Sequence, residues 1–358
     1  MKHTILITGA AGYVGAMLVH KLAAREDVLR IVGLDKEPLA DFIAGVEKLT
    51  YLSTNTADAW EEKVRQYQPD VVIHAAWQIR EMYGNQKEQW KWNVEGSDRV
   101  FDFVFSEASV KRLIYFSTVA SYGSYPTNEI EHRFTEEEPF RESDYLYAEE
   151  KRVVESHLEE KYAAAKVKGT AVEVAVVRPA AITGPRGRFM RIRFGLQAAL
   201  SGQLRESLIH RVVSMMVSFV PVTKKWCRQF IHEDDVVDIV ELLALSPLKR
   251  QYDAFNICPP GDVVRGSDMA RAVGKRTIRM NPYLIRFAFF VMWHLSRGRV
   301  PTSRGSWKGY SYPIAVTGEK LTREYGYQYR SVPYEAFFYT DGRYEDHVPE
   351  GKRRHKSA

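Results

Sequence analysis

Short hydrophobic runs alternate along the chain with longer stretches in which apolar and polar positions mix. The runs are rich in Val and Ile and have the length of strands buried on both faces; they lie at residues 4–8, 28–34, 70–76, 112–117 and 171–177. The stretches between them have helical length and lie at residues 13–25, 57–67, 86–108 and 144–165. Alternation of this kind builds a parallel sheet with helices on both faces. The pattern therefore predicts an α/β fold with a doubly wound parallel sheet.

The regular alternation ends after Pro179, where Gly184-Pro185-Arg186-Gly187 marks a loop. A helix near residues 235–245 and a strand near residues 253–257 then resume it. We therefore expect a first domain over residues 1–180 and a smaller C-terminal lobe that is interleaved with it. The lobe would take most of residues 181–350, with about residues 229–260 returning to the first domain and residues 351–358 forming a basic tail.

Residues 283–295 form the most apolar helix candidate in the chain. The segment is shorter than the ~20 residues that span a bilayer. Arg279, Arg286, Arg297 and Arg299 surround it, a pattern that also suits a helix lying on anionic lipid. We favour a lid or core helix over a pocket to peripheral membrane contact, because a lid needs no extra partner.

The charge of the chain is uneven. Residues 1–180 carry 22 Lys+Arg and 29 Asp+Glu, whereas residues 181–358 carry 29 Lys+Arg and 16 Asp+Glu. A basic second half suggests an anionic substrate or an acidic surface. A solvated face together with the basic tail is the simpler interpretation. No nucleic-acid-binding motif accompanies the charge, so we expect no nucleic-acid partner.

The cysteine and histidine content argues against a disulfide framework and a metal site. Cys227 and Cys258 are the two cysteines, and neither has the spacing of a metal ligand. His74 and His232 also lack companions at a suitable spacing. We expect no metal and a reducing, cytoplasmic location.

A glycine-rich segment follows the first predicted strand and opens the first predicted helix. Gly9 would allow a tight turn, Gly12 would let the backbone approach a pyrophosphate, and Gly15 would allow close packing of helix on strand. The N–H groups at the start of the helix would face the phosphates. Asp35 ends the second strand, where its carboxylate would accept hydrogen bonds from a ribose diol. The segment predicts a dinucleotide site that prefers NAD to NADP, a preference that Lys36 moderates.

Tyr147 and Lys151 are four residues apart in a predicted helix, so their side chains lie on one face. A lysine ammonium beside a tyrosine lowers a phenol pKa that is about 10 in water. Such a tyrosine exchanges a proton with a substrate hydroxyl while hydride moves to or from a nicotinamide. The same spacing occurs at Tyr83…Lys87 and Tyr162…Lys166, which we interpret as surface pairs.

From the glycine spacing onward, the chain resembles the extended short-chain dehydrogenase/reductase family, which includes NAD-dependent epimerases and dehydratases. Further segments resemble the family's motifs in the family's order: Asn55-Thr56-Ala57-Asp58, His74-Ala75-Ala76, Asn93-Val94-Glu95-Gly96, Phe116 to Gly123, Arg178-Pro179…Gly184-Pro185, and Arg228 to Asp235. Asn55 stands where the family usually has an aspartate, and an amide also bonds the adenine edge. The resemblance implies an NAD(P)-binding Rossmann domain over residues 1–180 and a substrate-binding lobe after it.

The resemblance also implies roles for single residues. Counted back from Tyr122-Gly123, the catalytic hydroxyl falls on Thr118. Thr118, Tyr147 and Lys151 would be catalytic, and Thr118 and Arg228 would contact substrate. The cofactor-binding residues would be Gly9, Ala11, Gly12, Tyr13, Val14, Gly15, Asp35, Lys36, Asn55, Thr56, Ala75, Ala76, Asn93, Tyr147, Lys151 and Pro179.

The family resemblance leaves the net reaction open. Nucleotide-sugar dehydratases of the family carry Asp-Glu after the catalytic Thr, where this chain has Val119-Ala120. Nucleotide-sugar members usually carry an asparagine where this chain has Ala181. Our first interpretation is an oxidoreductase or epimerase that acts on a hydroxyl or ketone of an unassigned substrate. A nucleotide-sugar epimerase is the runner-up.

Two groups of side chains bear on the substrate. Four arginines follow the loop after Pro179, and we interpret them as a solvated loop rather than an anion site: Arg186, Arg188, Arg191 and Arg193. Several apolar residues would suit a hydrophobic alcohol or ketone if they lined the pocket, although core packing is the simpler interpretation: Met215, Met216, Phe219, Trp226 and the segment 283–295.

Two further expectations follow from the resemblance. A homodimer through the helices near residues 86–108 and 144–165 is implied by it. A protein that binds NAD without turnover is the alternative from another class. The intact set of Thr118, Tyr147 and Lys151 argues against that alternative, because such family members commonly lack the tyrosine or the lysine.

Overall fold

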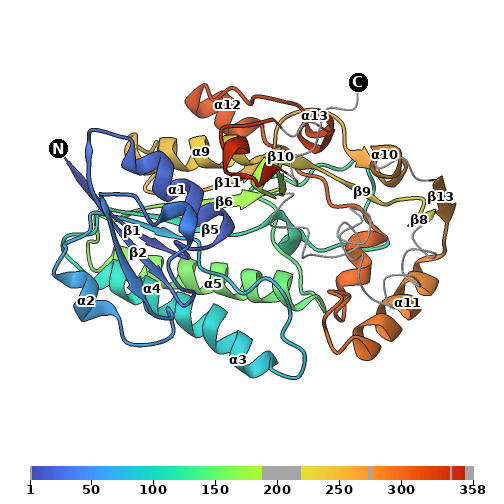
Figure 1. Cartoon of the computed structure of the whole chain (residues 1–358), viewed down its shortest axis with the longest axis horizontal. Helices are drawn as coiled ribbons and strands as arrows, with labels where there is room; N and C mark the ends of the chain where they lie inside the picture. Colours follow the sequence, from blue (N-terminus) through green and yellow to red (C-terminus); the bar gives the residue numbers. More distant parts are fainter. Residues whose placement is uncertain (1, 188–218, 273–275, 339–340, 351–358) are drawn as a thin grey trace.

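A parallel sheet of seven strands forms the centre of the molecule (Figure 1). Its spatial order is β11 (Tyr252–Ile257), β6 (Glu173–Pro179), β5 (Arg112–Phe116), β4 (Val71–His74), β1 (His3–Thr8), β2 (Val28–Asp35) and β3 (Leu49–Ser53). Every neighbouring pair in it is parallel. The predicted doubly wound α/β fold is confirmed. The strand order reverses between β1 and β4, and sheets of this kind bind ligands in the crevice at that point.

The computed structural model describes residues 2–187, 219–272, 276–338 and 341–350. The predictions for Arg188, Arg191, Arg193, Met215 and Met216 lie outside the described residues. So does the predicted basic tail, residues 351–358.

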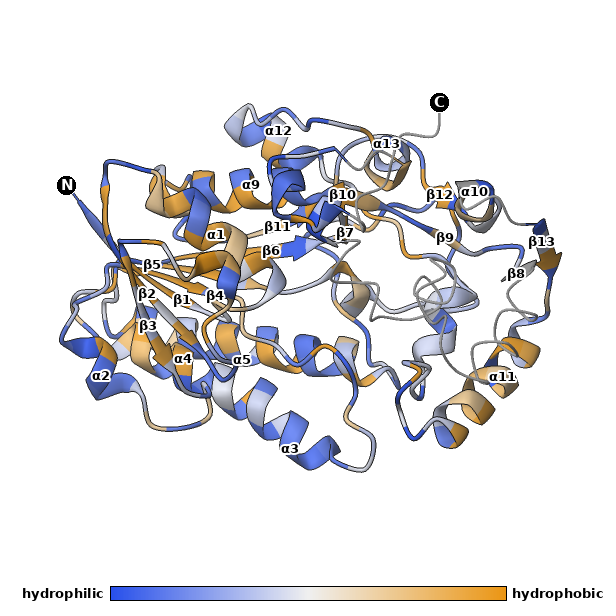
Figure 2. Cartoon of the chain, viewed as in Figure 1, coloured by the Kyte–Doolittle hydropathy of each residue, from blue (hydrophilic) through white to orange (hydrophobic). Residues whose placement is uncertain are grey.

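Helices cover both faces of the sheet (Figure 1). One face carries α1 (Tyr13–Ala23) and α9 (Glu233–Leu245); the other carries α4 (Gly96–Ser106) and α5 (Leu146–Val167), with α2 (Glu61–Arg65) and α3 (Gln86–Trp90) nearby. The strands alternate between the two cores, since Ile5 and Ile7 pack on the α1 side and Leu6 packs on the α4 side. Burial on both faces explains why these strands are continuous hydrophobic runs (Figure 2).

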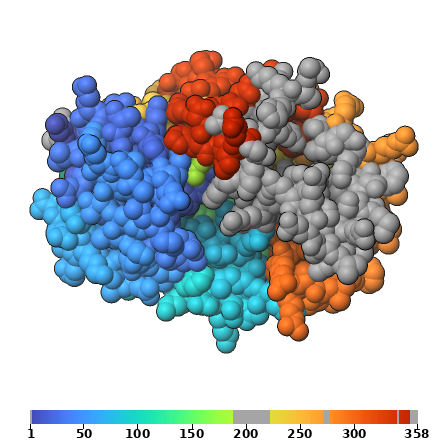
Figure 3. Space-filling model, viewed as in Figure 1, coloured from blue at the N-terminus to red at the C-terminus, as the bar shows by residue number. Residues whose placement is uncertain are grey.

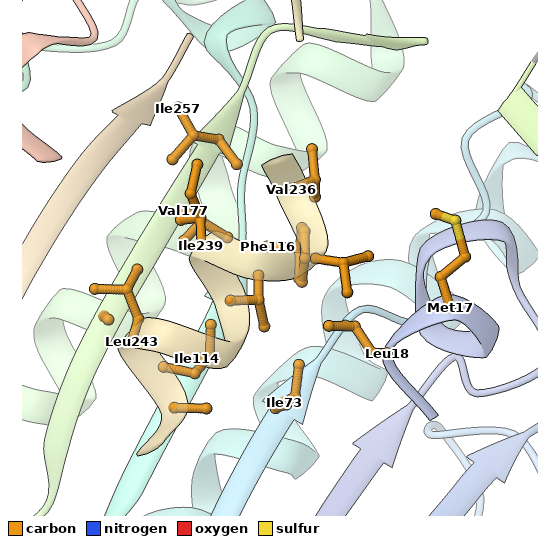
Figure 4. Packing of buried hydrophobic residues seen from close by; sticks show 14 of the residues in the cluster. Met17, Leu18, Ile73, Ile114, Phe116, Val177, Val236, Ile239, Leu243 and Ile257 are labelled. Carbon is orange, nitrogen blue, oxygen red and sulfur yellow. The ribbon is translucent and has the colours of Figure 1, made fainter. Parts of the chain in front are cut away.

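The core beneath α1 and α9 is drawn in Figure 4. Met17 and Leu18 of α1 and Ile239 of α9 pack together above the sheet, and all three are fully buried. Ile114 and Val177 meet them from the strands. This packing anchors the start of α1 and the start of α9 beside the carboxyl ends of the strands.

Two local features differ from the predicted pattern. The sequence pattern missed β3, because this edge strand is only half buried and has no continuous apolar run. The single helix expected over residues 86–108 is divided into α3 and α4 by one turn of π-helix, Lys91–Glu95. Such turns insert one extra residue and are frequent at functional sites.

The second lobe lies beyond the carboxyl ends of the strands (Figure 1). Its strands form three small pairs: β7 (Ala181–Thr183) with β10 (Phe230–His232), β9 (Cys227–Arg228) with β12 (Val264–Arg265), and β8 (Phe219–Val222) with β13 (Arg276–Arg279). Its helices are α10 (Gly266–Ala272), α11 (Pro282–Leu295), α12 (Glu319–Tyr325) and α13 (Pro333–Phe338). Between these segments the chain returns to the sheet as α9 and β11. The division at residues 180 and 350 stays a prediction.

Helix α11 is the apolar segment singled out in the sequence. Its start is fixed by Asn281, whose side-chain oxygen accepts the Tyr283 N–H at 2.9 Å, and by Pro282 in the first turn. Ile285, Phe289 and Trp293 recur every four residues and are the buried face. Among the described residues, no helix is long and apolar enough to cross a membrane.

Candidate active site

The glycine segment forms a tight turn between β1 and α1. Gly9 has a φ of +74°, and its N–H donates to the Leu34 carbonyl at 2.7 Å. A Cβ on Gly15 would lie 2.0 Å from the Gly9 carbonyl oxygen, so no side chain fits there. Gly12 precedes the first turn of α1, and no side chain caps that turn. Its N–H groups are therefore open to a ligand that carries negative charge.

A cavity of about 760 Å³ runs from this turn along the carboxyl ends of the strands to the second lobe. That volume is in the range of small-molecule sites. It is lined by every predicted site residue except Lys151: Gly9, Ala11, Gly12, Tyr13, Val14, Gly15, Asp35, Lys36, Asn55, Thr56, Ala75, Ala76, Asn93, Thr118, Tyr147, Pro179 and Arg228. The structure thus brings residues from nine separate segments of the chain to one cavity.

Asp35 stands beside the glycine turn at the end of β2. Its carboxylate accepts the N–H of Ala11 at 3.0 Å and the N–H of Glu37 at 3.0 Å, and burial raises its pKa. The neighbouring Lys36 is engaged elsewhere, since its ammonium lies 3.0 Å from Glu37 and 4.2 Å from the centre of the Trp92 ring. The cavity wall at this place is therefore a fixed carboxylate.

Thr118 and Tyr147 reach the cavity from adjacent elements. Thr118 follows β5 and caps the helical turn Val119–Tyr122, and its hydroxyl oxygen accepts the Ala120 N–H at 3.2 Å. That bond leaves the hydroxyl proton of Thr118 available to a ligand. Tyr147 is in the first turn of α5, and its ring centre lies 5.8 Å from that of Tyr145.

Lys151 lies one turn further along α5 and does not line the cavity. Only 3% of it is exposed, and its ammonium donates to the Phe116 carbonyl at the end of β5. The ammonium also lies 3.5 Å from the centre of the Trp77 ring, which does line the cavity. Burial lowers the pKa of Lys151 well below its ordinary value, although the carboxylates of Glu155 and Glu150 oppose this.

A buried carboxyl group joins the π-helical turn to α5. Glu150 accepts a hydrogen bond from the Asn93 side-chain amide at 2.7 Å and one from Gln89 at 3.1 Å. Asn93 also accepts the N–H of Gln78 at 2.8 Å, in the loop after β4. Burial raises the pKa of Glu150 to about 7. The sequence analysis found Asn93 but missed Glu150, whose only signal was its place directly before Lys151.

A second buried carboxyl group lies beside Tyr13 at the start of α1. Glu233 begins α9 and accepts the Tyr13 hydroxyl, together with the N–H of Gly187 at 2.8 Å and of Arg186 at 3.2 Å. Burial raises the pKa of Glu233 to about 7. Arg186 is itself buried, with its guanidinium 3.6 Å from the centre of the Phe42 ring. The interpretation of Arg186 as part of a solvated loop is therefore wrong.

The far end of the cavity is made of side chains from the second lobe. Arg228 of β9 lies 4.7 Å from the centre of the Tyr310 ring, and Trp293 of α11 contributes an indole. Trp226, by contrast, is buried in a separate apolar cluster and does not line the cavity. The sequence analysis missed several of the lining residues: Trp77, Gln78, Arg80, Trp92, Ser124, Tyr125, Tyr145, Ser303, Ser306, Lys308, Tyr310 and Tyr312. Most lie in irregular segments, and the clustering of Gly and aromatic residues at 305–312 was the one available signal.

The two other tyrosine–lysine spacings have different environments. Tyr83 is exposed and contacts α11, with its hydroxyl 3.1 Å from the His294 ring nitrogen. Tyr162 is buried against Phe105 and Tyr252. The surface interpretation is therefore wrong for Tyr162, because this position of α5 faces the core.

Histidine and carboxylate side chains do not gather into a metal site in the part of the chain that the structure describes. His74 is fully buried, and its two ring nitrogens lie 2.7 Å from the Thr8 hydroxyl and 2.8 Å from the Ser97 hydroxyl. Burial lowers the pKa of His74 to about 3, so the ring is neutral. It joins β1, β4 and α4 beneath the cavity.

The model of the NAD dependent epimerase/dehydratase family matches residues 5–258, which is most of the chain. The chain belongs to this family. It is therefore an enzyme of the extended short-chain dehydrogenase/reductase type, as its motifs predicted.

Individual relatives are distant. An uncharacterised protein of Mycobacterium tuberculosis is 23% identical over 342 residues, covering 93% of this chain and 82% of its own length. The Bordetella bronchiseptica enzyme WbmG, solved with NAD, is 20% identical with a TM-score of 0.66, over 94% of this chain and 92% of that one. A Thermus thermophilus UDP-glucose 4-epimerase, also solved with NAD, is 18% identical with a TM-score of 0.66, over 96% and 98% of the two chains. At these identities the two solved structures support the fold.

Proposed function

We propose that this enzyme is an NAD-dependent oxidoreductase or epimerase that acts on a hydroxyl or ketone, with Tyr147 as the proton-transfer residue. The observation that carries the proposal is that Thr118 and Tyr147 line the same cavity as the glycine turn. The turn fits a dinucleotide, because a Cβ on Gly15 would collide with the backbone and the start of α1 is uncapped.

A protein side chain would transfer the proton, while the cofactor would accept or donate the hydride. When bound, the nicotinamide supplies the hydride acceptor or donor. In the oxidising direction Tyr147, as the phenolate, would take the proton of the substrate hydroxyl while that carbon gives up its hydride to the nicotinamide, which would leave a ketone. Thr118 donates a hydrogen bond to that oxygen, because its own oxygen already accepts from the Ala120 backbone. In the reverse direction, the proton and the hydride would both be added to the ketone.

The choice of NAD over NADP rests on Asp35. Its carboxylate is fixed by two backbone N–H groups at the cavity wall, where it would accept hydrogen bonds from a ribose diol. A 2′-phosphate at the same place would meet like charge. Lys36 does not relieve that repulsion, since Glu37 and the Trp92 ring hold its ammonium.

A nucleotide-sugar epimerase is the specific alternative. It is supported by Arg228, which places positive charge at the substrate end of the cavity, and by Tyr310 beside it. The Thermus neighbour is named for this activity. Ala181, which also lines the cavity, weighs against it, because it leaves no amide at that wall.

The family match shows an enzyme and so argues against the alternative of a protein that binds NAD without turnover; one observation nevertheless bears on how Lys151 would take part in catalysis. The Lys151 ammonium is held by the Phe116 carbonyl and the Trp77 ring instead of lining the cavity. For catalysis, Lys151 would have to reach the ribose and the tyrosine when the cofactor is bound.

The substitution Tyr147→Phe separates these classes. We expect turnover of an alcohol to fall by about 10²–10⁴-fold, while the NAD dissociation constant from calorimetry stays the same. Tyr83→Phe is the matched control, because Tyr83 has the same spacing to a lysine but does not line the cavity. Hydride exchange is measured with labelled NAD and a panel of alcohols that includes UDP-glucose. Full turnover in Tyr147→Phe would refute the catalytic assignment, and absence of NAD binding by the wild type would refute the cofactor.

A homodimer through α4 and α5 and a cytoplasmic location complete the proposal. The dimer is implied by family resemblance, and sedimentation at micromolar concentration tests it, with a monomer as the result that refutes it. Fractionation of the source cells tests the location.

A further inference from the structure

Helix α11 has a second face whose large apolar side chains are exposed. Phe287 and Phe290 are 66% and 61% exposed, and Leu295 at the end of the helix is 82% exposed. Tyr283 and Leu284 extend the same surface at the start of the helix, and both are also exposed. A contiguous apolar surface of this kind on a protein marks a site of interaction. We name these five residues the outer face of α11.

The two faces of α11 follow from the helical repeat. Residues 285, 289 and 293 are spaced by four and are buried, whereas residues 283, 287 and 290 lie on the opposite side. Figure 2 shows that the helix is largely hydrophobic along its length. Figure 3 shows part of this region of the chain, in orange, at the surface of the molecule beside the cyan segment.

The charge around α11 is of one sign. Between Asp268 and Glu319 the sequence has nine Lys and Arg residues and no Asp or Glu. Six of the arginines are exposed, and none of the six forms an ion pair within the described part of the chain: Arg276, Arg279, Arg286, Arg297, Arg299 and Arg304. The positive charge there is therefore not compensated within the described part of the chain, and it would suit an anionic partner.

Exposed apolar side chains, together with nearby arginines that form no ion pair, indicate which kind of partner would bind this surface. Exposed Phe, Tyr and Leu residues on one side of a helix enter the boundary between lipid headgroups and acyl chains, while arginines contact the anionic headgroups. A soluble acidic partner would match the arginines but would not explain why five large apolar side chains are exposed.

We propose that the outer face of α11 docks this enzyme on the surface of an anionic lipid bilayer. The helix lies in the plane of the surface and does not cross it, since it has only 14 residues. The same helix places Trp293 in the wall of the cavity on its inner side. Docking therefore brings the substrate end of the cavity to the membrane, whichever substrate the enzyme uses.

The docking is tested by co-sedimentation of the full-length protein with vesicles. The vesicles are phosphatidylcholine alone, or phosphatidylcholine with about a third phosphatidylglycerol. We expect binding to the anionic vesicles at 0.1 M salt, weaker binding to the neutral ones, and weakening at 0.5 M salt. Failure of the wild type to bind anionic vesicles would overturn the proposal.

Two double variants test the apolar side chains and the arginines of this surface separately. In Phe287→Ser/Phe290→Ser we expect the partition coefficient to fall by at least about tenfold. In Arg297→Glu/Arg299→Glu we expect a fall of at least about 20-fold on anionic vesicles and little change on neutral ones. Unchanged binding of either variant would contradict the assignment of the outer face.

The matched controls are at the end of α5 that is remote from the cavity. Val167→Ser removes an apolar side chain that is 90% exposed, and Lys166→Glu/Lys168→Glu reverses two exposed charges. Both controls should bind vesicles as the wild type does. NAD affinity and the thermal midpoint verify that each variant is folded.

A measurement on the wild type alone keeps the test valid if a variant does not fold. Anionic vesicles should slow hydrogen exchange over residues 276–304 and leave α4 unchanged. If instead the variants convert a dimer to a monomer in sedimentation, without vesicles, the outer face contacts a second copy of the chain and the lipid assignment is wrong.

Discussion

The two ends of the cavity are built in different ways. At the proposed cofactor end the wall includes the turn from Gly9 to Gly15, whose glycines expose backbone, together with residues such as Asp35, Asn55 and Thr56. At the substrate end the wall is mostly side chains, among them Arg228, Tyr310 and Trp293, and they come from segments far apart in the chain. A binding site made of backbone requires particular residues at fixed spacings, so it can be predicted from the sequence alone. A side-chain site can be rebuilt for another substrate without disturbing the sheet.

The largest effect is expected from a single methyl group at the cofactor end. In Gly15→Ala the new Cβ would meet the Gly9 carbonyl at 2.0 Å, so the turn must open. We expect NAD affinity in calorimetry to fall by at least about 100-fold, because α1 no longer presents its N–H groups to the pyrophosphate. Gly45→Ala is the control, since nothing lies within 4 Å of its added Cβ. Normal NAD affinity in Gly15→Ala would mean that the turn is not the phosphate site.

The second effect should be confined to the substrate end. If the substrate is anionic, Arg228→Gln should raise its KM by about 10–100-fold, the value of a lost charged hydrogen bond, without changing the NAD dissociation constant. Arg228→Lys keeps the charge and should recover part of the loss. A change in NAD affinity would show that the two ends are not separate, and an unchanged KM would remove Arg228 from the substrate site.

A smaller effect is expected from Asp35 at the proposed cofactor end. In Asp35→Asn one oxygen can still accept the Ala11 N–H, but the negative charge is gone. We expect NAD to bind about tenfold more weakly and NADP to bind more tightly than in the wild type. Calorimetry with both cofactors measures the ratio. A ratio that does not move would locate the discrimination elsewhere.

The smallest effect concerns stability and comes from Glu150, which is buried behind Asn93 of the cavity wall. Burial raises the pKa of Glu150 from 4.5 to about 7. The folded state therefore keeps a proton that the unfolded state releases, and stability falls as pH rises from about 4.5 to 7. Glu150→Gln removes this loss, so we expect it to be more stable than the wild type at pH 8 by about 1–3 kcal/mol and equal to it near pH 4.5.

The adjacent Glu149 is the control for this titration. Burial raises its pKa, but the hydrogen bond from Arg152 and the Ser143 N–H outweigh burial, so the pKa is lowered. Its stabilising contribution is lost as pH falls, and Glu149→Gln should be less stable than the wild type at pH 8. Urea unfolding at pH 5 and pH 8 measures both variants. The same sign for both would contradict the burial of Glu150.

The sequence was sufficient to predict the repeating strands and the turn that follows the first of them. Six of the seven strands were predicted, because strands buried on both faces are continuous apolar runs. β3 was missed because it is a half-buried edge strand. The glycine turn and Asp35 were predicted from their fixed places relative to strand ends, and Thr118 was predicted from the family resemblance; all of them line the cavity.

The remainder depends on contacts that no local pattern encodes. Tyr162 follows Leu158 by four residues on the buried face of α5, and its contact with Tyr252 comes from a strand made much later in the chain. Glu233 meets Tyr13 across 220 residues. The engagement of Lys151 with Trp77 and Phe116 likewise depends on three elements at once. Spacing motifs predict which residues approach the site but not what each one touches there.

The position of β11 bears on how this chain is made. β6 ends at Pro179, and its outer edge is paired by β11, which begins at Tyr252. At about 5–20 residues per second, synthesis of residues 180–251 takes roughly 4–14 s, and over that time β6 has an unpaired edge. Unpaired edges recruit other strands, so this interval is when the nascent chain is most exposed to aggregation. A fragment that ends before Tyr252 would carry the same open edge permanently, even though it contains the complete glycine turn and Tyr147.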